Sequence, residues 1–224
     1  MLIYAVADIH GKKSHLTTIR ENIDKYNPDL LVVAGDLARR FRYRNILKEL
    51  NNLKIPVVSI LGNTDWKFIH RIMDRESNLI NLNLNNYTNK EFSFVGISGT
   101  ITLPFKNIVC FNEKKRFDKI SEFMSKDTIL VAHPPPYGIL DMVFRKYHSG
   151  SRYLKKFIEE HQPQLVLCGH IHEQTGRAFI EQTLVVNCAM TKHSKGAMIK
   201  LGKDHMPKVE LVKSKGVKLL EGKL

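Results

Sequence analysis

Short apolar runs that end in polar residues recur along the chain. Five of them have the length of a β-strand and span residues 2–7, 30–34, 57–61, 129–132 and 165–168. After the first two runs, apolar side chains recur at helical spacing, at positions 16, 19, 23 and 26 and again at positions 46, 47, 50 and 53. Such spacing gathers apolar residues on one face of a helix. The pattern predicts a β-α-β-α-β opening in which amphipathic helices cover a sheet.

The last quarter of the chain has a different pattern. Apolar runs at 184–187, 197–201 and 209–212 are short and are separated by Gly, Lys and polar residues. They predict hairpins, which we expect to form a second sheet packed on the first. Residues 78–89 contain six Asn and are expected to be a mobile surface loop with one short strand. A chain of 224 residues without a linker is expected to be a single domain over residues 1–224.

Polar residues with metal-binding side chains follow the strand-like runs. They occur in five segments: Asp8-Ile9-His10, Gly35-Asp36, Gly62-Asn63-Thr64-Asp65, His133 and Gly169-His170-Ile171-His172. The C-terminal ends of parallel strands share one edge of a sheet, where open α/β folds place their ligands. We therefore expect these segments to meet at that edge.

The number of donors indicates more than one metal ion. Two carboxylates, four imidazoles and one amide oxygen are available: Asp8, Asp36, His10, His133, His170, His172 and Asn63. One octahedral ion needs only about six ligands and a structural zinc about four. Two ions roughly 3.5–4 Å apart, bridged by a carboxylate, would use all of them. Mixed nitrogen and oxygen ligands favour Mn, Fe, Ni, Co or Zn over Ca.

The order of these segments, from residue 3 to 172, resembles the calcineurin-like metallophosphoesterase superfamily. The resemblance implies an α/β fold, a four-layer αββα sandwich of two mixed β-sheets with a dimetal site at the C-terminal strand edge. It implies catalysis by attack of a metal-bridging hydroxide on phosphorus, with Asp36, Asn63 and His133 in the catalytic site. One metal would be bound by Asp8, His10 and His172, and the other by Asn63, His133 and His170. Asp36 would bridge the two ions, of which manganese is expected first.

Position 64 departs from the commonest family pattern, because many members have a His there and this chain has Thr64. The variant resembles the branch that includes phosphodiesterases. A threonine hydroxyl has no pKa near neutrality and cannot deliver a proton to a leaving group. We therefore expect Thr64 to bind substrate, and phosphodiester or phosphoanhydride bonds to be cleaved in preference to alkyl monoesters. Asp65 is expected either to support a metal-ligating His or to begin a helix over 66–75.

The formal charge of +13 favours an anionic phosphate-ester substrate. Arg39 and Arg40 follow Asp36 closely and are expected to contact a phosphate, although a solvated helix start is the alternative. Pro134 to Pro136 is expected to stiffen the chain after His133. The remaining histidines are expected at the surface or in loops: His15, His70, His148, His161, His193 and His205.

Two other functions stay open. A nuclease is compatible with the charge, but nucleic acid is not the favoured partner because no aromatic-basic repeat is evident. A metal-free interaction scaffold would have no need of all seven donors. No apolar run approaches the ~18 residues of a membrane span, and Cys110, Cys168 and Cys188 lack the spacing of a disulfide framework. We expect a cytoplasmic protein, and the oligomeric state is not predicted.

Overall fold

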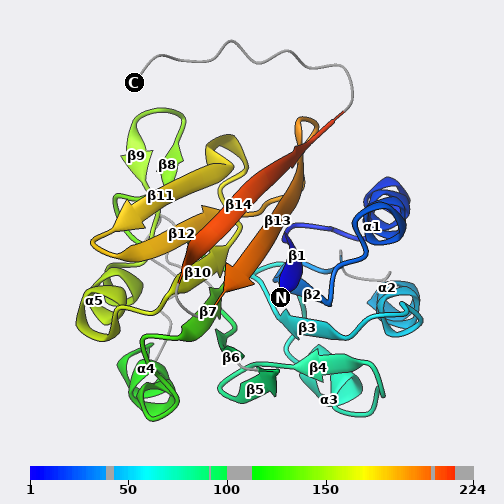
Figure 1. Cartoon of the computed structure of the whole chain (residues 1–224), viewed down its shortest axis with the longest axis horizontal. Helices are drawn as coiled ribbons and strands as arrows, with labels where there is room; N and C mark the ends of the chain where they lie inside the picture. Colours follow the sequence, from blue (N-terminus) through cyan, green and yellow to red (C-terminus); the bar gives the residue numbers. More distant parts are fainter. Residues whose placement is uncertain (39–42, 91, 100–112, 203–204, 215–224) are drawn as a thin grey trace.

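The computed structural model describes residues 1–38, 43–90, 92–99, 113–202 and 205–214. Its first six-stranded sheet has the order β14-β13-β1-β2-β3-β4 (Figure 1). The strands are β1 (Leu2–Val6), β2 (Leu30–Ala34), β3 (Val57–Ile60), β4 (Leu79–Asn81), β13 (Ser194–Gly202) and β14 (His205–Lys213). Strands β1 to β4 are parallel, whereas β13 and β14 run antiparallel to their neighbours.

The second six-stranded sheet has the order β11-β12-β10-β7-β6-β5. Its strands are β5 (Asn86–Asn89), β6 (Phe92–Ile97), β7 (Thr128–Ala132), β10 (Leu165–Cys168), β11 (Gly176–Ile180) and β12 (Thr183–Asn187). The four central strands are parallel, and the two edge strands β5 and β11 are antiparallel. Both sheets are therefore mixed.

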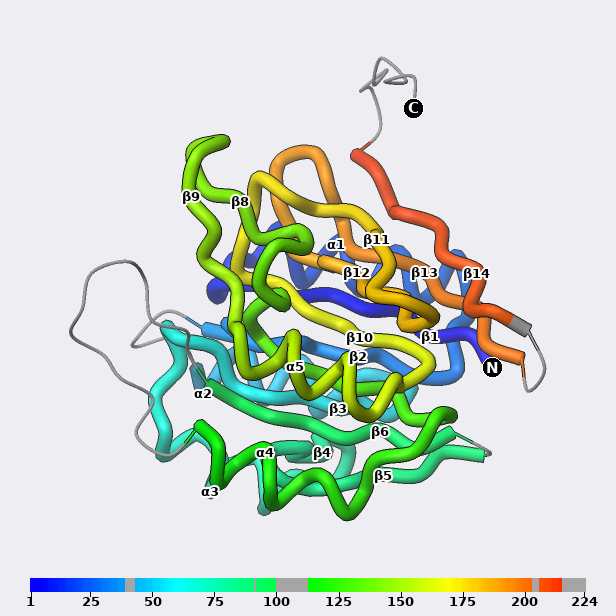
Figure 2. The backbone as a smooth tube through the Cα atoms, turned by 90° about the vertical axis from the view of Figure 1, so that its left-hand side faces the viewer, coloured from blue at the N-terminus to red at the C-terminus, as the bar shows by residue number. Residues whose placement is uncertain are grey.

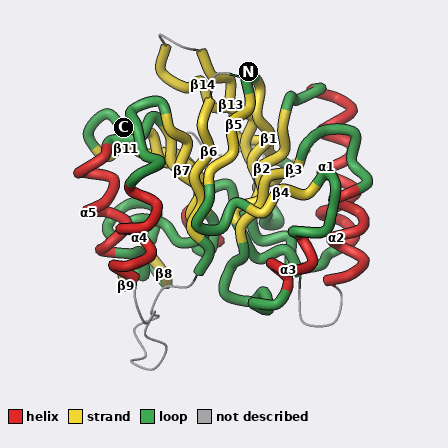
Figure 3. Tube along the Cα trace, turned by 90° about the horizontal axis from the view of Figure 1, so that it is seen from below, coloured by secondary structure: helices red, strands yellow, loops and turns green. Residues whose placement is uncertain are grey.

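Alternating side chains of the strands build a four-layer sandwich. On β1, Ile3 faces the core between the two sheets, while Tyr4 faces the helices α1 (Lys13–Tyr26), α2 (Tyr43–Asn51) and α3 (Ile69–Met73). On the second sheet, Phe94 faces the same central core and Val95 packs against α4 (Glu113–Ser121) and α5 (Arg152–His161). Figure 3 shows the two sheets between these outer helices. The αββα architecture implied by the resemblance is confirmed.

The C-terminal strands differ from the expectation of a separate second sheet. β13 pairs with β1, with Tyr4 opposite Met198, and β14 pairs with β13, so this hairpin extends the N-terminal sheet. β12 instead joins β10 in the other sheet. Each hairpin thus covers an otherwise open edge of a parallel sheet, an arrangement that protects unpaired backbone groups.

Two further local expectations are wrong. The Asn-rich segment contains two strands, β4 and β5, and the Asn78 side-chain amide donates to the carbonyls of Leu53 and Ile55. The helix expected over 66–75 is restricted to α3. Its flanks form turns of the i to i−3 type, in which Ile69 N–H donates to the Trp66 carbonyl.

A short hairpin projects beside the strand ends. It consists of β8 (Met142–Val143) and β9 (Tyr147–His148), which pair antiparallel. Figure 2 shows this hairpin on the side of the molecule toward which β1 runs from the N-terminus. Within the described ranges, no helix has the length and apolar character needed to cross a membrane.

Candidate metal centre

The candidate site lies where the C-terminal ends of strands from both sheets meet. β1, β2 and β3 of the first sheet and β7 and β10 of the second each lead directly into one of the donor segments. Backbone hydrogen bonds join these segments: Asp8 N–H donates to the Gly35 carbonyl at 3.0 Å, and Gly169 N–H donates to the His133 carbonyl at 2.9 Å. The site is therefore shared by two sheets, whereas the sequence suggested one sheet edge.

Left-handed backbone conformations occur at four of the donor positions. The φ angles are 60° at Asp8, 51° at His10, 54° at Asp36 and 69° at His170. Non-glycine residues in this conformation cost roughly 1–3 kcal/mol each, and such residues cluster at functional sites. These residues follow β1, β2 and β10, and the left-handed conformations there help to direct the donor side chains toward one another.

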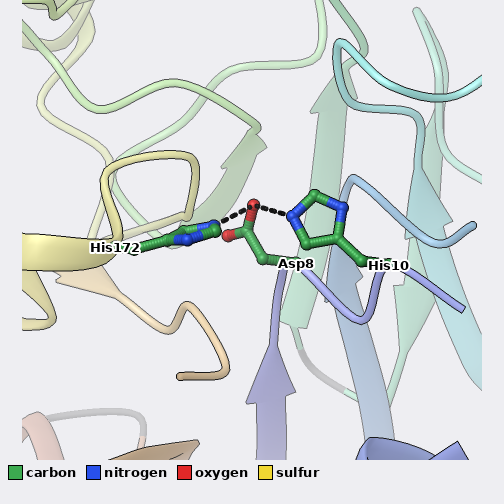
Figure 4. Close-up of side chains that lie close together, drawn as sticks. All are labelled: Asp8, His10 and His172. Carbon is green, nitrogen blue, oxygen red and sulfur yellow. Dashed lines mark ion pairs between the residues drawn. The ribbon is translucent and has the colours of Figure 1, made fainter. Parts of the chain in front are cut away.

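Asp8, His10 and His172 form the first donor group (Figure 4). Asp8 Oδ1 lies 3.1 Å from His172 Nε2 and 3.7 Å from His10 Nε2, and the other Asp8 oxygen accepts from His170 N–H at 2.9 Å. Burial alone would raise the pKa of Asp8, but His172, His133 and the His170 N–H outweigh burial and hold this pKa below its ordinary value. The hydrogen bond with Asp8 in turn raises the pKa of His172.

Asn63, His133 and His170 form the second donor group. Asn63 Oδ1 lies 3.0 Å from His133 Nε2 and 2.9 Å from His170 Nδ1. Burial would lower the pKa of His133, but the carboxylates of Asp36 and Asp8 outweigh burial and raise this pKa. Burial and the neighbouring His133 lower the pKa of His170 to about 4. The His133 imidazole therefore keeps a proton to a higher pH than the His170 imidazole does.

The hydrogen bonds of His133 indicate whether the second donor group fits a cation. His133 Nδ1 is 2.8 Å from the Ala34 carbonyl, which only accepts, so Nδ1 carries the hydrogen. In the neutral ring the lone pair of Nε2 then faces Asn63 Oδ1, which is also a lone-pair donor. Two such atoms 3.0 Å apart repel each other unless a cation or a proton lies near both. The donor set thus fits a divalent metal.

Asp36 lies between the two donor groups. Its Oδ1 is 3.5 Å from His133 Nε2 in the second group, and its Oδ2 is 3.7 Å from His10 Nδ1 in the first. Oδ1 also accepts from Thr64 N–H at 2.9 Å. The side chain is almost fully buried. One carboxylate oxygen is therefore directed to each group.

Glycines before the donors allow this close packing. A Cβ atom at Gly62 would collide with the Asp36 carboxylate, and one at Gly169 would lie 2.6 Å from Asp8 Oδ2. Real Cβ atoms do not approach other atoms so closely. Glycine is needed here for space and not only for turn formation.

Asp65 has neither of its two expected roles. Its carboxylate accepts three backbone N–H groups, from Leu37 at 3.0 Å, Ala38 at 3.0 Å and Gly62 at 2.9 Å. Burial raises the pKa of Asp65 in spite of these hydrogen bonds. Asp65 therefore fastens the segment after Asp36 to the segment that carries Asn63. No sequence pattern indicated this contact, because its partners are main-chain groups.

The remaining predicted residues have different outcomes. Thr64 lies beside Asp36, and its Oγ1 is buried without a hydrogen-bond partner in the part of the chain that the structure describes. Arg39 and Arg40 lie outside the described residues.

His15 is buried at 5% exposure and not on the surface, with a pKa that burial lowers to about 4. Its spacing of four residues from Ile19 could have indicated this position on the buried face of α1.

Known proteins resemble this chain along most of its length. The model of the calcineurin-like phosphoesterase family matches residues 1–174. An uncharacterized protein of Methanocaldococcus jannaschii is 32% identical over 198 residues, covering 84% of this chain and 87% of that protein. A UPF0046 protein of Caenorhabditis elegans is 25% identical over 208 residues, covering 84% of this chain and 69% of its own length.

Solved structures show the same fold. The crystal structure of TT1561 of Thermus thermophilus superposes with a TM-score of 0.71 at 16% identity, covering 95% of this chain and 98% of that one. A structure described as a novel archaeal phosphodiesterase gives a TM-score of 0.52 at 13% identity, covering 95% of this chain and 100% of that one. The family match extends over more than half of the chain and ends just after His172, the last of the donors. The chain therefore belongs to the calcineurin-like phosphoesterase family.

Proposed function

We propose that the protein is a dinuclear-metal-dependent phosphodiesterase that hydrolyses phosphodiester or phosphoanhydride bonds. The observation that carries the proposal is the position of Asp36, whose two oxygens are directed to two separate donor groups. A single carboxylate between two sets of imidazoles is the arrangement that a pair of bridged ions requires. The family of the chain supports a phosphoesterase activity.

In this proposal Asp8, His10 and His172 would hold one ion, and Asn63, His133 and His170 would hold the other. Asp36 would contribute one carboxylate oxygen to each. Nitrogen and oxygen donors without sulfur suit Mn, Fe, Ni, Co or Zn, and manganese is our first candidate. When bound, the ions supply the Lewis acidity that activates water and neutralises charge on the phosphoryl oxygens.

The side chains of the protein hold this centre in position. The hydrogen bond from His133 Nδ1–H to the Ala34 carbonyl fixes the ring so that Nε2 faces the site. Thr64 N–H orients the Asp36 carboxylate, and the position of Thr64 beside the donors supports a role in substrate binding.

The preference for substrates with acidic leaving groups rests on Thr64. A hydroxyl cannot act as the proton-delivering acid that alkoxide leaving groups need. Aryl esters and phosphates leave without such help, so they are the better substrates.

Hydrolysis of a substrate panel tests the proposal. The metal-free protein should be inactive, and added Mn²⁺ should restore turnover of bis(4-nitrophenyl) phosphate above that of an alkyl monoester such as glycerol 3-phosphate. Oligonucleotides in the same panel, at several salt concentrations, test the nuclease alternative. Full metal occupancy without hydrolysis of any phosphate ester would reject the enzyme, and a protein that neither binds metal nor hydrolyses these esters would favour the metal-free interaction scaffold.

A further inference from the structure

We infer that a pocket beside the metal centre binds the nucleobase of a nucleotide-type substrate. The pocket measures about 550 Å³ and lies between β9 and the N-terminus of α5. Its lining includes Tyr137, Lys146, Tyr147, Ser149, Arg152 and Tyr153, and we call it the hairpin pocket. The inference rests on the proposed function, because it assigns the group that the diesterase site holds next to the scissile phosphate.

The hairpin pocket is tied to the metal centre through the backbone. Tyr137 follows His133 after only three prolines, and Ser151 N–H donates to the Pro135 carbonyl at 2.9 Å. Tyr137 N–H donates back to the Ser151 carbonyl at 3.0 Å. Four residues of extended chain span at most ~14 Å, so the Cα atom of Tyr137 lies within that distance of the Cα atom of His133. This bound places the hairpin pocket near the donor groups, and the inference assigns one nucleotide-type ligand to both.

Aromatic side chains are unusually exposed around this pocket. Among the described residues, six large hydrophobic side chains are exposed. Two of them, Tyr147 and Tyr153, line this pocket and are each 51% exposed, and Phe144, at 81%, is in the turn of the adjoining hairpin. Exposed rings beside a ligand site offer flat faces on which bases stack. The rings are therefore available to a ligand and are not consumed by the protein core.

Cations accompany these rings. The Arg152 guanidinium lies 4.1 Å from the centre of the Tyr137 ring, and Lys146 Nζ lies 5.3 Å from that of Tyr147. A guanidinium stacked on a tyrosine presents a second planar surface, and both charges attract the phosphates of a nucleotide. Rings and cations together suit a base joined to phosphate better than they suit a free phosphate.

The turn between β8 and β9 has residues that are unfavourable for its backbone conformation. Phe144 and Arg145 have φ angles of 52° and 53°, and Lys146 N–H closes the turn on the Val143 carbonyl at 3.1 Å. Two-residue turns of this kind favour Asn-Gly, because a Cβ atom is disfavoured in the left-handed region. A strained turn that exposes a phenylalanine and an arginine supports a role in binding.

Calorimetric titration of the metal-loaded enzyme tests the inference, with adenosine 5′-monophosphate, ribose 5-phosphate and inorganic phosphate as probes. The wild type should bind the nucleotide roughly tenfold or more tightly than ribose 5-phosphate, as expected for base stacking. The double variant Tyr147→Ala/Tyr153→Ala should lose this ratio. Tyr147→Phe/Tyr153→Phe should keep it, because the rings remain. Phe179→Ala, on β11 and 50% exposed, is the matched control and should also keep it.

Equal affinity of the wild type for the two sugar phosphates, or a ratio that survives the double alanine variant, would overturn the inference. Since both tyrosines are half exposed, a thermal melt should confirm that the variants fold. Hydrolysis is measured separately, so diesterase activity without a base preference rejects only the pocket. The base could belong to a dinucleoside pyrophosphate or to an oligonucleotide. Comparing the KM values of a dinucleoside pyrophosphate and a trinucleotide in the wild type and the double variant distinguishes these two sources.

Discussion

Asp65 and Ala38 follow different strands of the first sheet, and a 3.0 Å hydrogen bond joins the Asp65 carboxylate to the Ala38 backbone N–H. The same carboxylate accepts from Leu37 and Gly62. It therefore holds the segment after Asp36 against the segment that carries Asn63. The spacing of Asp36 and Asn63 therefore depends on Asp65, which is not itself one of the donors.

Asp65→Asn should destabilise the protein, because its side-chain NH₂ group would face backbone N–H donors. Leaving buried donors unsatisfied costs about 1–3 kcal/mol. Urea denaturation of the metal-free protein should show this loss as a lower midpoint with an unchanged slope. Asp118→Asn, on the exposed face of α4, should leave the midpoint unchanged. An equal midpoint for both variants would show that the three hydrogen bonds contribute nothing.

Asp36→Asn should abolish hydrolysis and reduce metal content while the fold is retained. The change removes one negative charge from between two cations and leaves a poorer bridging ligand. Elemental analysis and circular dichroism of the same sample measure both effects, again with Asp118→Asn as the control. Near-normal turnover at full metal occupancy would contradict the bridging role.

His133→Ala should empty one metal position and leave the other occupied. His133 belongs to the group with Asn63 and His170, whereas Asp8, His10 and His172 lie together. The metal content should fall from about two ions per chain toward one. His161→Ala, at the end of α5, is the matched histidine control. Retention of both ions by His133→Ala would remove this residue from the ligand set.

The sequence predicted that the candidate donors would lie close together, because each segment follows a strand and parallel strands of a sheet bring their ends to one edge. It did not predict that two sheets would share the site. It did not predict that β13 returns to pair with β1, because an apolar run carries no information about which strand will be its neighbour. Nor could it assign Asp65, whose partners are backbone amides without a sequence identity. The hairpin pocket was missed for a similar reason, since Tyr137 and Arg152 meet only in the fold.

Metal binding near pH 7 should release protons. The pKa of His172 is raised by Asp8, and that of His133 is raised by Asp36 and Asp8, which outweigh burial. A raised pKa keeps these imidazoles protonated above the ordinary value of about 6.5, yet only the neutral form binds metal. Affinity should therefore increase as the pH rises through these pKa values. Calorimetry in buffers of different ionisation enthalpy counts the protons, and a count of zero would disprove the coupling.

The rate on phosphate esters should fall steeply as the leaving group becomes less acidic, because Thr64 cannot protonate it. Thr64→His should flatten this dependence and raise monoesterase activity by up to about 10²–10⁴. Thr64→Val, which lacks the hydroxyl but keeps the shape, should leave the dependence as steep as in the wild type. A wild-type enzyme that cleaves alkyl monoesters faster than aryl diesters would show that another group supplies the proton.

The pairing of two metal ions on Asp36 is tested most directly by anomalous diffraction from crystals of the protein loaded with Mn²⁺. We predict two anomalous peaks roughly 3.5–4 Å apart, one beside Asp8, His10 and His172, the other beside Asn63, His133 and His170. Both should lie within bonding distance of the Asp36 carboxylate. A single peak at full loading, or two peaks that do not share Asp36, would contradict the dinuclear centre.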